Sequence, residues 1–238
     1  MGAQNEIKDL LSEYNSNMRK VEIISLISSA LLFLAILYRL FISPDNNYFL
    51  TALCIGSGFV LADFFAGIVH WFADTWGSVH WPVVGPTLIR SFREHHVDQN
   101  AITRHDFVET NGSSALAVLP LLLTAIFYQP TTQLAIFFVG TAAWLCAFIV
   151  FTNQFHKWAH TSKNSQFVSL LQNSQIILPR KHHARHHAGK FDRDYCITSG
   201  WLNPLLNKIG FFSGLEYLVS RMTGAIPREE DAKFTELF

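Results

Sequence analysis

Residues 133–152 read QLAIFFVGTAAWLCAFIVFT, a stretch without a single charged side chain. About 20 apolar residues in a helix cross the hydrocarbon core of a bilayer. Helices of soluble proteins normally carry one polar face, whereas this stretch is apolar all round. It therefore predicts a membrane-spanning helix, and the alternative of a soluble all-α protein with very apolar core helices is disfavoured.

Three further apolar runs extend this pattern, over residues 21–42, 49–72 and 114–128. The first two are long enough to span, and the third spans only with its polar flanks or in a locally thinner bilayer. Short segments with proline, 43–48 and 129–132, join the runs into two hairpins. Charged residues make up 15% of the chain, against about 25% in an average soluble protein. The expected fold class is all-α, an integral membrane protein with about four transmembrane helices.

Basic residues predict the orientation of these helices. Of the 18 Lys and Arg, only Arg39 falls on the side of the short hairpin loops. The positive-inside bias therefore places both termini and the loop between the second and third runs in the cytoplasm. We expect a cytoplasmic segment over 1–20, a membrane domain over 21–225 and a polar tail over 226–238. The membrane would be the endoplasmic reticulum in a eukaryote and the inner membrane in a bacterium.

Charge and cysteine content exclude several classes of function. The net charge is zero, so nothing indicates a nucleic-acid partner. Three cysteines without a CxxC pair argue against a disulfide scaffold and against a cysteine-based zinc site. Two apolar stretches near the C-terminus are too interrupted to span, and we expect them at the membrane surface. Their apolar residues include Trp201, Leu205, Phe211, Phe212, Leu215 and Leu218.

Eleven histidines are the unusual feature of the composition, and all fall at the inferred cytoplasmic side. The segments HWFAD (70–74), HKWAH (156–160) and HHARHH (182–187) place ligand-type residues four apart, hence on one helical face. A basic, solvated helix face is the alternative for HHARHH. Imidazole suits iron, zinc or copper, and so many histidines exceed the need of one metal. His80 has no helical partner and is interpreted as an ordinary surface histidine. The candidate ligands are His70, His95, His96, His105, His156, His160, His182, His183, His186 and His187.

Several long motifs resemble one known family. They are GIVHWFADTWGS (67–78), SFREHHVDQNAITRHDFVETNG (91–112), FTNQFHKWAHT (151–161), ILPRKHHARHH (177–187) and YCITSGWLNPLLNKIGFF (195–212). The chain resembles the Kua/CarF family of membrane lipid desaturases, whose members include plasmanylethanolamine desaturases. The resemblance implies a fatty-acid-desaturase-like fold with a cytoplasmic histidine-rich cap, two non-haem irons and O2 as co-substrate. The best-known reaction converts 1-O-alkyl glycerophospholipids into 1′-2′ vinyl ethers, whereas a plant branch desaturates an acyl chain of phosphatidylglycerol.

The resemblance leads to a mechanistic hypothesis. Asp63, Asp74 and Asp106 would orient the imidazole N–H groups. Arg90, Arg93 or Arg180 would lie near the phospholipid head group. Because the chain has no haem or flavin motif, electrons must come from an external donor of the cytochrome b5 or ferredoxin type.

Other functions remain open from the sequence alone. They are a di-iron lipid hydroxylase, a zinc-dependent membrane hydrolase and a transition-metal transporter. A transporter should place histidines deep in several spans, and this chain gathers them at one face.

Overall fold

The computed structural model describes residues 16–76, 78, 81–82, 84–188 and 191–228. Within these residues the secondary structure is helical and contains no β-strand. The long helices are α2 (Ser16–Phe41), α3 (Tyr48–Thr75), α6 (Phe107–Phe127) and α7 (Gln133–His160). The shorter ones are the π-helix η1 (Gly85–Ile89), α4 (Arg90–Val97), α5 (Ala101–Arg104), α8 (Gln166–Asn173), α9 (Arg180–His186), α10 (Asn203–Lys208) and α11 (Phe211–Thr223).

The four long helices are each long and apolar enough to cross a membrane, which confirms the predicted fold class. The third one begins at Phe107, seven residues before the predicted run. Its start is set by Asp106, whose side chain accepts a hydrogen bond from the Glu109 backbone N–H at 3.0 Å. The apolar pattern missed this first part because it is polar, although a polar turn still forms a helix once it is capped.

The short loops at the outer end are tied together by side chains. Arg39, near the end of α2, donates to the backbone carbonyls of Ile126 and Tyr128 at the end of α6. Ser43 donates to the Pro130 carbonyl at 3.0 Å. These bonds satisfy carbonyl groups that a helix C-terminus leaves without a partner. The two hairpins are thereby joined at the end farthest from the histidines.

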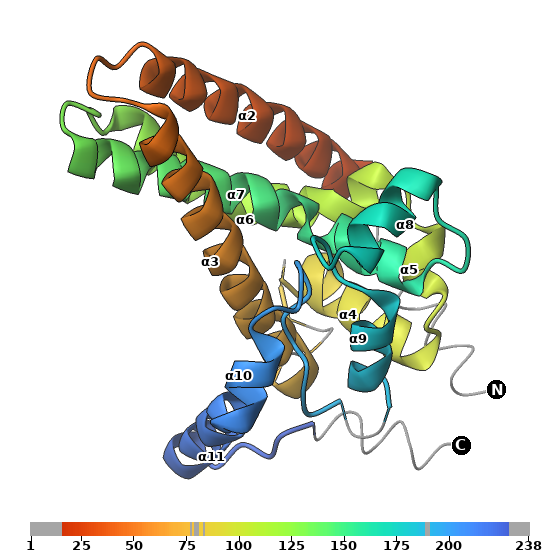
Figure 1. The fold of residues 1–238 in the computed structure, drawn as a ribbon. Coiled ribbons are helices and arrows are strands. Elements are labelled where there is room, and N and C mark those ends of the chain that lie inside the picture. Colours follow the sequence, from red (N-terminus) through yellow and green to blue (C-terminus); the bar gives the residue numbers. More distant parts are fainter. Residues whose placement is uncertain (1–15, 77, 79–80, 83, 189–190, 229–238) are drawn as a thin grey trace.

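The four long helices pack as two pairs, and α6 and α7 join one pair to the other. Helix α2 packs on α6 and α3 packs on α7, with α6 and α7 in contact between the pairs. A Cβ atom on Gly58 would lie 2.7 Å from the Leu145 backbone nitrogen, so only glycine allows α3 to approach α7 this closely. Figure 1 shows α3 diverging from α6 and α7 toward its C-terminal end, where α4 and α9 fill the space.

Two of the spans are longer than a bilayer requires. Helices α3 and α7 have 28 residues each. At 1.5 Å per residue each is about 42 Å long, whereas the hydrocarbon core is about 30 Å thick. The last turns, which carry His70 and Asp74 on α3 and His156 and His160 on α7, can therefore extend beyond the hydrocarbon.

An irregular segment, residues 194–200, is buried against these last turns. Asp63 of α3 accepts backbone N–H bonds from Ser199 (2.8 Å), Gly200 (2.9 Å) and Leu202 (3.2 Å). Thr198 bonds the side chain of Thr152 on α7 at 2.7 Å. Non-helical backbone at membrane depth must find its partners inside the protein, and these bonds provide them.

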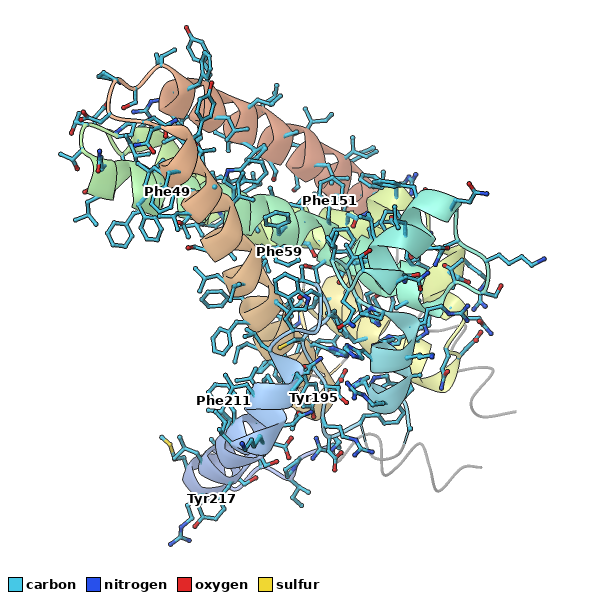
Figure 2. All side chains as sticks on the ribbon, viewed as in Figure 1. Phe49, Phe59, Phe151, Tyr195, Phe211 and Tyr217 are labelled. Carbon is cyan, nitrogen blue, oxygen red and sulfur yellow. The ribbon has the colours of Figure 1, made fainter. Side chains whose placement is uncertain are left out.

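The C-terminal helices α10 and α11 lie beside α3, away from α7 (Figure 1). Apolar side chains such as Leu205 (56% exposed), Leu218 (51%) and Met222 (76%) face outward, as a helix at a membrane surface would require. Phe212 does not fit the expected surface position, because it is buried and packs on Tyr195 at 4.8 Å between ring centroids. Figure 2 shows Tyr217 pointing outward from α11, while Tyr195 lies inside.

Candidate metal centre

Nine ligand-type side chains form two groups at the inner end of the bundle. In each group one ligand atom per residue lies within 4.8 Å of every other. The first group, called the five-histidine group here, consists of His95, His156, His160, His183 and His187. The second, called the aspartate group, consists of His70, Asp74, His96 and His186. Figure 2 shows side-chain nitrogen atoms gathered near Tyr195, between α3 and α9.

The Nε2 atoms of the five-histidine group point at one another. His183 Nε2 lies 2.8 Å from His156 Nε2 and 2.7 Å from His160 Nε2, which are themselves 3.2 Å apart. A hydrogen bond needs one N–H and one lone pair, so three nitrogens in mutual contact cannot all be paired. Nitrogens at about 2.0–2.1 Å from one shared ion lie about 3 Å apart. The arrangement therefore fits a metal ion and does not fit a hydrogen-bonded histidine cluster.

The aspartate group is built around one carboxylate. Asp74 is fully buried, and its oxygens lie 3.1 Å from His70 Nε2, 3.3 Å from His186 Nε2 and 3.5 Å from His96 Nε2. Both carboxylate oxygens lack a hydrogen-bond partner, as does His70 Nε2. A buried carboxylate without partners is costly unless a cation lies beside it. Three imidazoles and one carboxylate therefore also form a suitable metal-binding set.

Backbone carbonyls orient several of these imidazoles. The Nδ1 atoms of His70, His95 and His186 lie 3.0, 3.0 and 2.8 Å from the carbonyl oxygens of Tyr195, Ser91 and Arg193 respectively. A carbonyl only accepts, so each Nδ1 must carry the hydrogen. Each Nε2 is then left with its lone pair directed into the site, which is the tautomer that a metal requires.

The two ligand groups are adjacent, because helices α4 and α9 each contribute residues to both of them. His95 and His96 are adjacent in α4, with ring centroids 4.7 Å apart, and they belong to different groups. On α9, His183 and His186 are likewise divided. Between the groups, the rings of His70 and His156 lie 5.6 Å apart. The geometry places two potential metal positions side by side in one pocket.

Burial keeps these histidines neutral. It lowers the pKa of His95 and His183 well below the ordinary value, and the neighbouring imidazoles lower it further. The pKa of His187 is also lowered, first by burial and then by His186 and His160. A metal ligand must be neutral imidazole, so the pocket maintains the ligand form near pH 7.

Two of the ten candidate histidines lie outside both groups. His182 is half-buried on α9 and its Nδ1 has no hydrogen-bond partner. His105 lies beside two carboxylates, with Nε2 at 3.3 Å from Glu94 and 3.7 Å from Glu109. His80, which we interpreted as a surface histidine, lies outside the described residues.

The acidic partners of His105 are also those of Arg90. The buried Arg90 guanidinium donates to Glu94 at 3.1 Å and to Glu109 at 2.8 Å. We expected Arg90 to lie near a lipid head group. The structure does not agree with this role, because Glu94 and Glu109 already neutralise the charge of Arg90. Sequence reasoning missed both glutamates, although Glu94 follows Arg90, and Glu109 follows His105, at the helical spacing of four.

Among the aspartate candidates, all of which the structure describes, Asp74 is the one that contacts imidazole groups. Asp63 accepts the backbone N–H groups described above, and Asp106 caps α6 and pairs with Arg19 at 2.6 Å, so neither holds a histidine as expected. Arg180 is exposed and donates to the Ser162 carbonyl at 2.8 Å, leaving it accessible at the inner surface. The side chain of Arg93 lies outside the described part of the chain.

Comparisons with known proteins agree with this geometry. The lipid desaturase domain matches residues 59–230. The chain is 40% identical over 228 residues to plasmanylethanolamine desaturase of Myxococcus xanthus, covering 96% of this chain and 81% of that protein. It is 46% identical over 220 residues to plasmanylethanolamine desaturase 1 of Mus musculus, covering 89% and 79%. It is 36% identical over 185 residues to fatty acid desaturase 4, chloroplastic, of Arabidopsis thaliana, covering 74% and 54%. No solved structure matches.

Proposed function

The chain belongs to the lipid desaturase domain family, and from this premise we propose that it forms the 1′-2′ vinyl ether bond of plasmalogens from 1-O-alkyl glycerophospholipids. Membership confirms the resemblance seen in the sequence motifs, and with it the assignment as a membrane lipid desaturase. The ether substrate is the finer part of the proposal. It is supported by the names of the two relatives that match nearly the whole chain.

The observation that carries the proposal is the pair of ligand groups at the inner end of the spans. Removing hydrogen from an unactivated C–H bond requires a strong oxidant, and two neighbouring irons that react with O2 supply one when bound. Histidines with a carboxylate and no cysteine suit non-haem iron better than structural zinc. We propose that the five-histidine group and the aspartate group each hold one iron.

The depth of the site supports a reaction close to the head group. Four of the ligand-type residues, His70, Asp74, His156 and His160, lie on the last turns of α3 and α7, which are long enough to extend past the hydrocarbon. The first two carbons of an ether chain lie at that level, whereas mid-chain carbons lie about 10 Å or more deeper in a core roughly 30 Å thick. A mid-chain desaturase would need a long tunnel to reach this site.

The surrounding residues orient the candidate metal ligands and exclude bulk water from them. Backbone carbonyls hold the imidazoles of His70, His95 and His186 in one tautomer. Asp74 places one negative charge between three imidazoles. Burial of these groups excludes bulk water, so hydrogen removal does not compete with side reactions of the solvent.

Electrons enter from outside the chain. Desaturation by O2 removes two hydrogens from the substrate and produces two waters, so each turnover consumes two further electrons and two protons. An external donor of the cytochrome b5 or ferredoxin type fits this need, since the basic-residue bias predicts that both termini and the metal pocket lie on the cytoplasmic side. The membrane would be the endoplasmic reticulum or a bacterial inner membrane.

The proposal is tested by expressing the chain in cells that make alkyl ether lipids and no vinyl ethers. Lipid mass spectrometry and acid-released aldehyde should show vinyl ethers only when both O2 and the wild-type chain are present. A matched chain with His156→Ala should give none at equal abundance. Vinyl ethers formed without O2 contradict the chemistry. Loss of saturated acyl chains with no aldehyde release instead assigns an acyl substrate, and a hydroxylated lipid assigns a hydroxylase.

A further inference from the structure

A cavity of about 290 Å³ lies beside the two ligand groups, with Phe92 of its lining close to His70 and His156. Its walls come from the inner ends of three spans and from the helices that cover them. Ala66 and Val69 belong to α3, Ala117 to α6, Ile149 to α7 and Leu88 to η1. The cavity is thus built where α3 diverges from α6 on one side of α7.

The lining of the cavity is apolar except at one place. None of the described residues that line it is charged. Four polar side chains line the cavity where α6 meets α7, namely Ser113, Ser114, Thr152 and Asn153. Asn153 donates to Ser114 Oγ at 3.1 Å, and Thr152 bonds Thr198 at 2.7 Å. Since Ser114 accepts this bond, its own hydroxyl hydrogen can be donated to an oxygen inside the cavity. The wall therefore suits a hydrocarbon chain that carries one acceptor oxygen at its end.

The ring of Phe92 connects the cavity to the metal-ligand groups. Phe92 lines the cavity, and its ring centroid lies 4.9 Å from that of His70 and 6.1 Å from that of His156. Thr152 precedes His156 by four residues on α7, a rise of about 6 Å. A chain in the cavity would have its first carbons within about one helical turn of the ligand groups.

The rim of the cavity faces the bilayer. Val69 is 41% exposed and Val84 is 40% exposed, and Ala117 is exposed on α6. These residues form an exposed apolar edge, which the predicted orientation of the spans places at the inner leaflet. A lipid chain can enter sideways from the membrane without passing through water.

We propose that this cavity binds the head-proximal part of the substrate's saturated chain, with the glycerol-linked oxygen at Ser114 and the first carbons against Phe92. Its volume is at the lower end of the roughly 300–1,000 Å³ of small-molecule pockets, so it holds part of one chain and leaves the remainder in the bilayer. The assignment deepens the proposed function and rests on it for the identity of the lipid.

The test is photo-cross-linking to iron-free protein in vesicles of saturated phosphatidylcholine. Two probes are used, a 1-O-alkyl and a 1-acyl glycerophosphoethanolamine, each with a diazirine on the first chain carbons. Label should map to the segments around Leu88 and Ala117. Ala117→Phe fills the cavity from its exposed rim, and we expect at least about tenfold less label, whereas the same change at the exposed, lipid-facing Ala52 leaves the label unchanged.

Ser114→Ala provides a second variant that fills no space. Loss of one hydrogen bond of about 1 kcal/mol corresponds to about fivefold less label, with Ser57→Ala on α3 as the matched control. Equal labelling of Ala117→Phe and Ala52→Phe, or label spread evenly over the lipid-facing residues, overturns the cavity assignment. Because the readout is binding without iron, cavity labelling by the acyl probe alone supports the cavity while rejecting the ether substrate.

Discussion

Replacing Asp74 by Asn tests the division of the ligands into two groups. The change keeps the shape of the side chain and removes its negative charge. Asp74 is fully buried against three imidazoles at 3.1–3.5 Å, and no described Lys or Arg side chain forms an ion pair with it. We expect the aspartate group to lose its metal first, while the five-histidine group, which contains no carboxylate, keeps its own.

The magnitude follows from the contacts of Asp74. Loss of a carboxylate that orients metal ligands typically lowers metal affinity 10–100-fold, which corresponds to about 1.4–2.8 kcal/mol. Direct ligation by Asp74 would make the loss larger. The stability of the metal-free protein should not fall, because the substitution removes a buried charge whose desolvation is unfavourable. Weaker metal binding at unchanged stability distinguishes this outcome from general unfolding.

The assay is metal content per chain after purification and graded exposure to a chelator. Wild-type protein should retain about two irons and Asp74→Asn about one under the same exposure. Asp106→Asn is the matched control, because Asp106 caps α6 and pairs with Arg19 at the surface, 87 residues away in sequence. Asn is also a good helix cap, and an exposed ion pair contributes only about 0–1 kcal/mol. Two equally tight irons in Asp74→Asn would refute the two-group arrangement.

Three further predictions use the same preparations. His160→Ala and His183→Ala should each abolish activity and release metal from the five-histidine group, whereas His80→Ala should keep most of both; a fully active His183→Ala contradicts the grouping. The metal-free protein should lose thermal stability progressively as the pH falls below about 6.5. The reason is that histidines of the unfolded chain take up protons there, whereas burial lowers the pKa of His95, His183 and His187 in the folded protein. A melting temperature that rises on acidification would contradict this sign. Tags at residue 1, near Gln99 and at residue 238 should all report cytoplasm, and a tag near Gln99 on the opposite side would separate histidines that the structure brings together.

The spans could be predicted from the sequence because membrane insertion depends on a local property. A helix in hydrocarbon must be apolar over its whole length, and the run from 133 to 152 meets this condition by itself. The ends of the helices could not be predicted in the same way. Helix α7 continues to His160, and its 28 residues are more than a bilayer requires, so its polar last turns can extend beyond the hydrocarbon.

The histidine pairs were predictable, but their assignment to metal positions was not. The spacing of four correctly places His156 with His160 and His183 with His187. The same rule pairs His182 with His186, yet only His186 enters a group. Which of the two does so depends on how α9 packs against α3 and α4, and that packing involves residues distant in sequence. The division of the neighbours His95 and His96 between two groups is likewise a property of the tertiary fold.

Asp63 contacts a different part of the protein from the one that sequence reasoning expected. It lies seven residues before His70, hence on the same face of α3, and under the mechanistic hypothesis we expected it to orient an imidazole N–H group. The structure instead has Asp63 holding the backbone of Ser199 and Gly200. That backbone belongs to the buried segment that also supplies the Tyr195 carbonyl to His70 Nδ1 at 3.0 Å. The carboxylate of Asp63 therefore acts on the candidate ligand His70 through the segment between them, and a buried charge in the membrane domain supports the orientation of an imidazole that it does not touch.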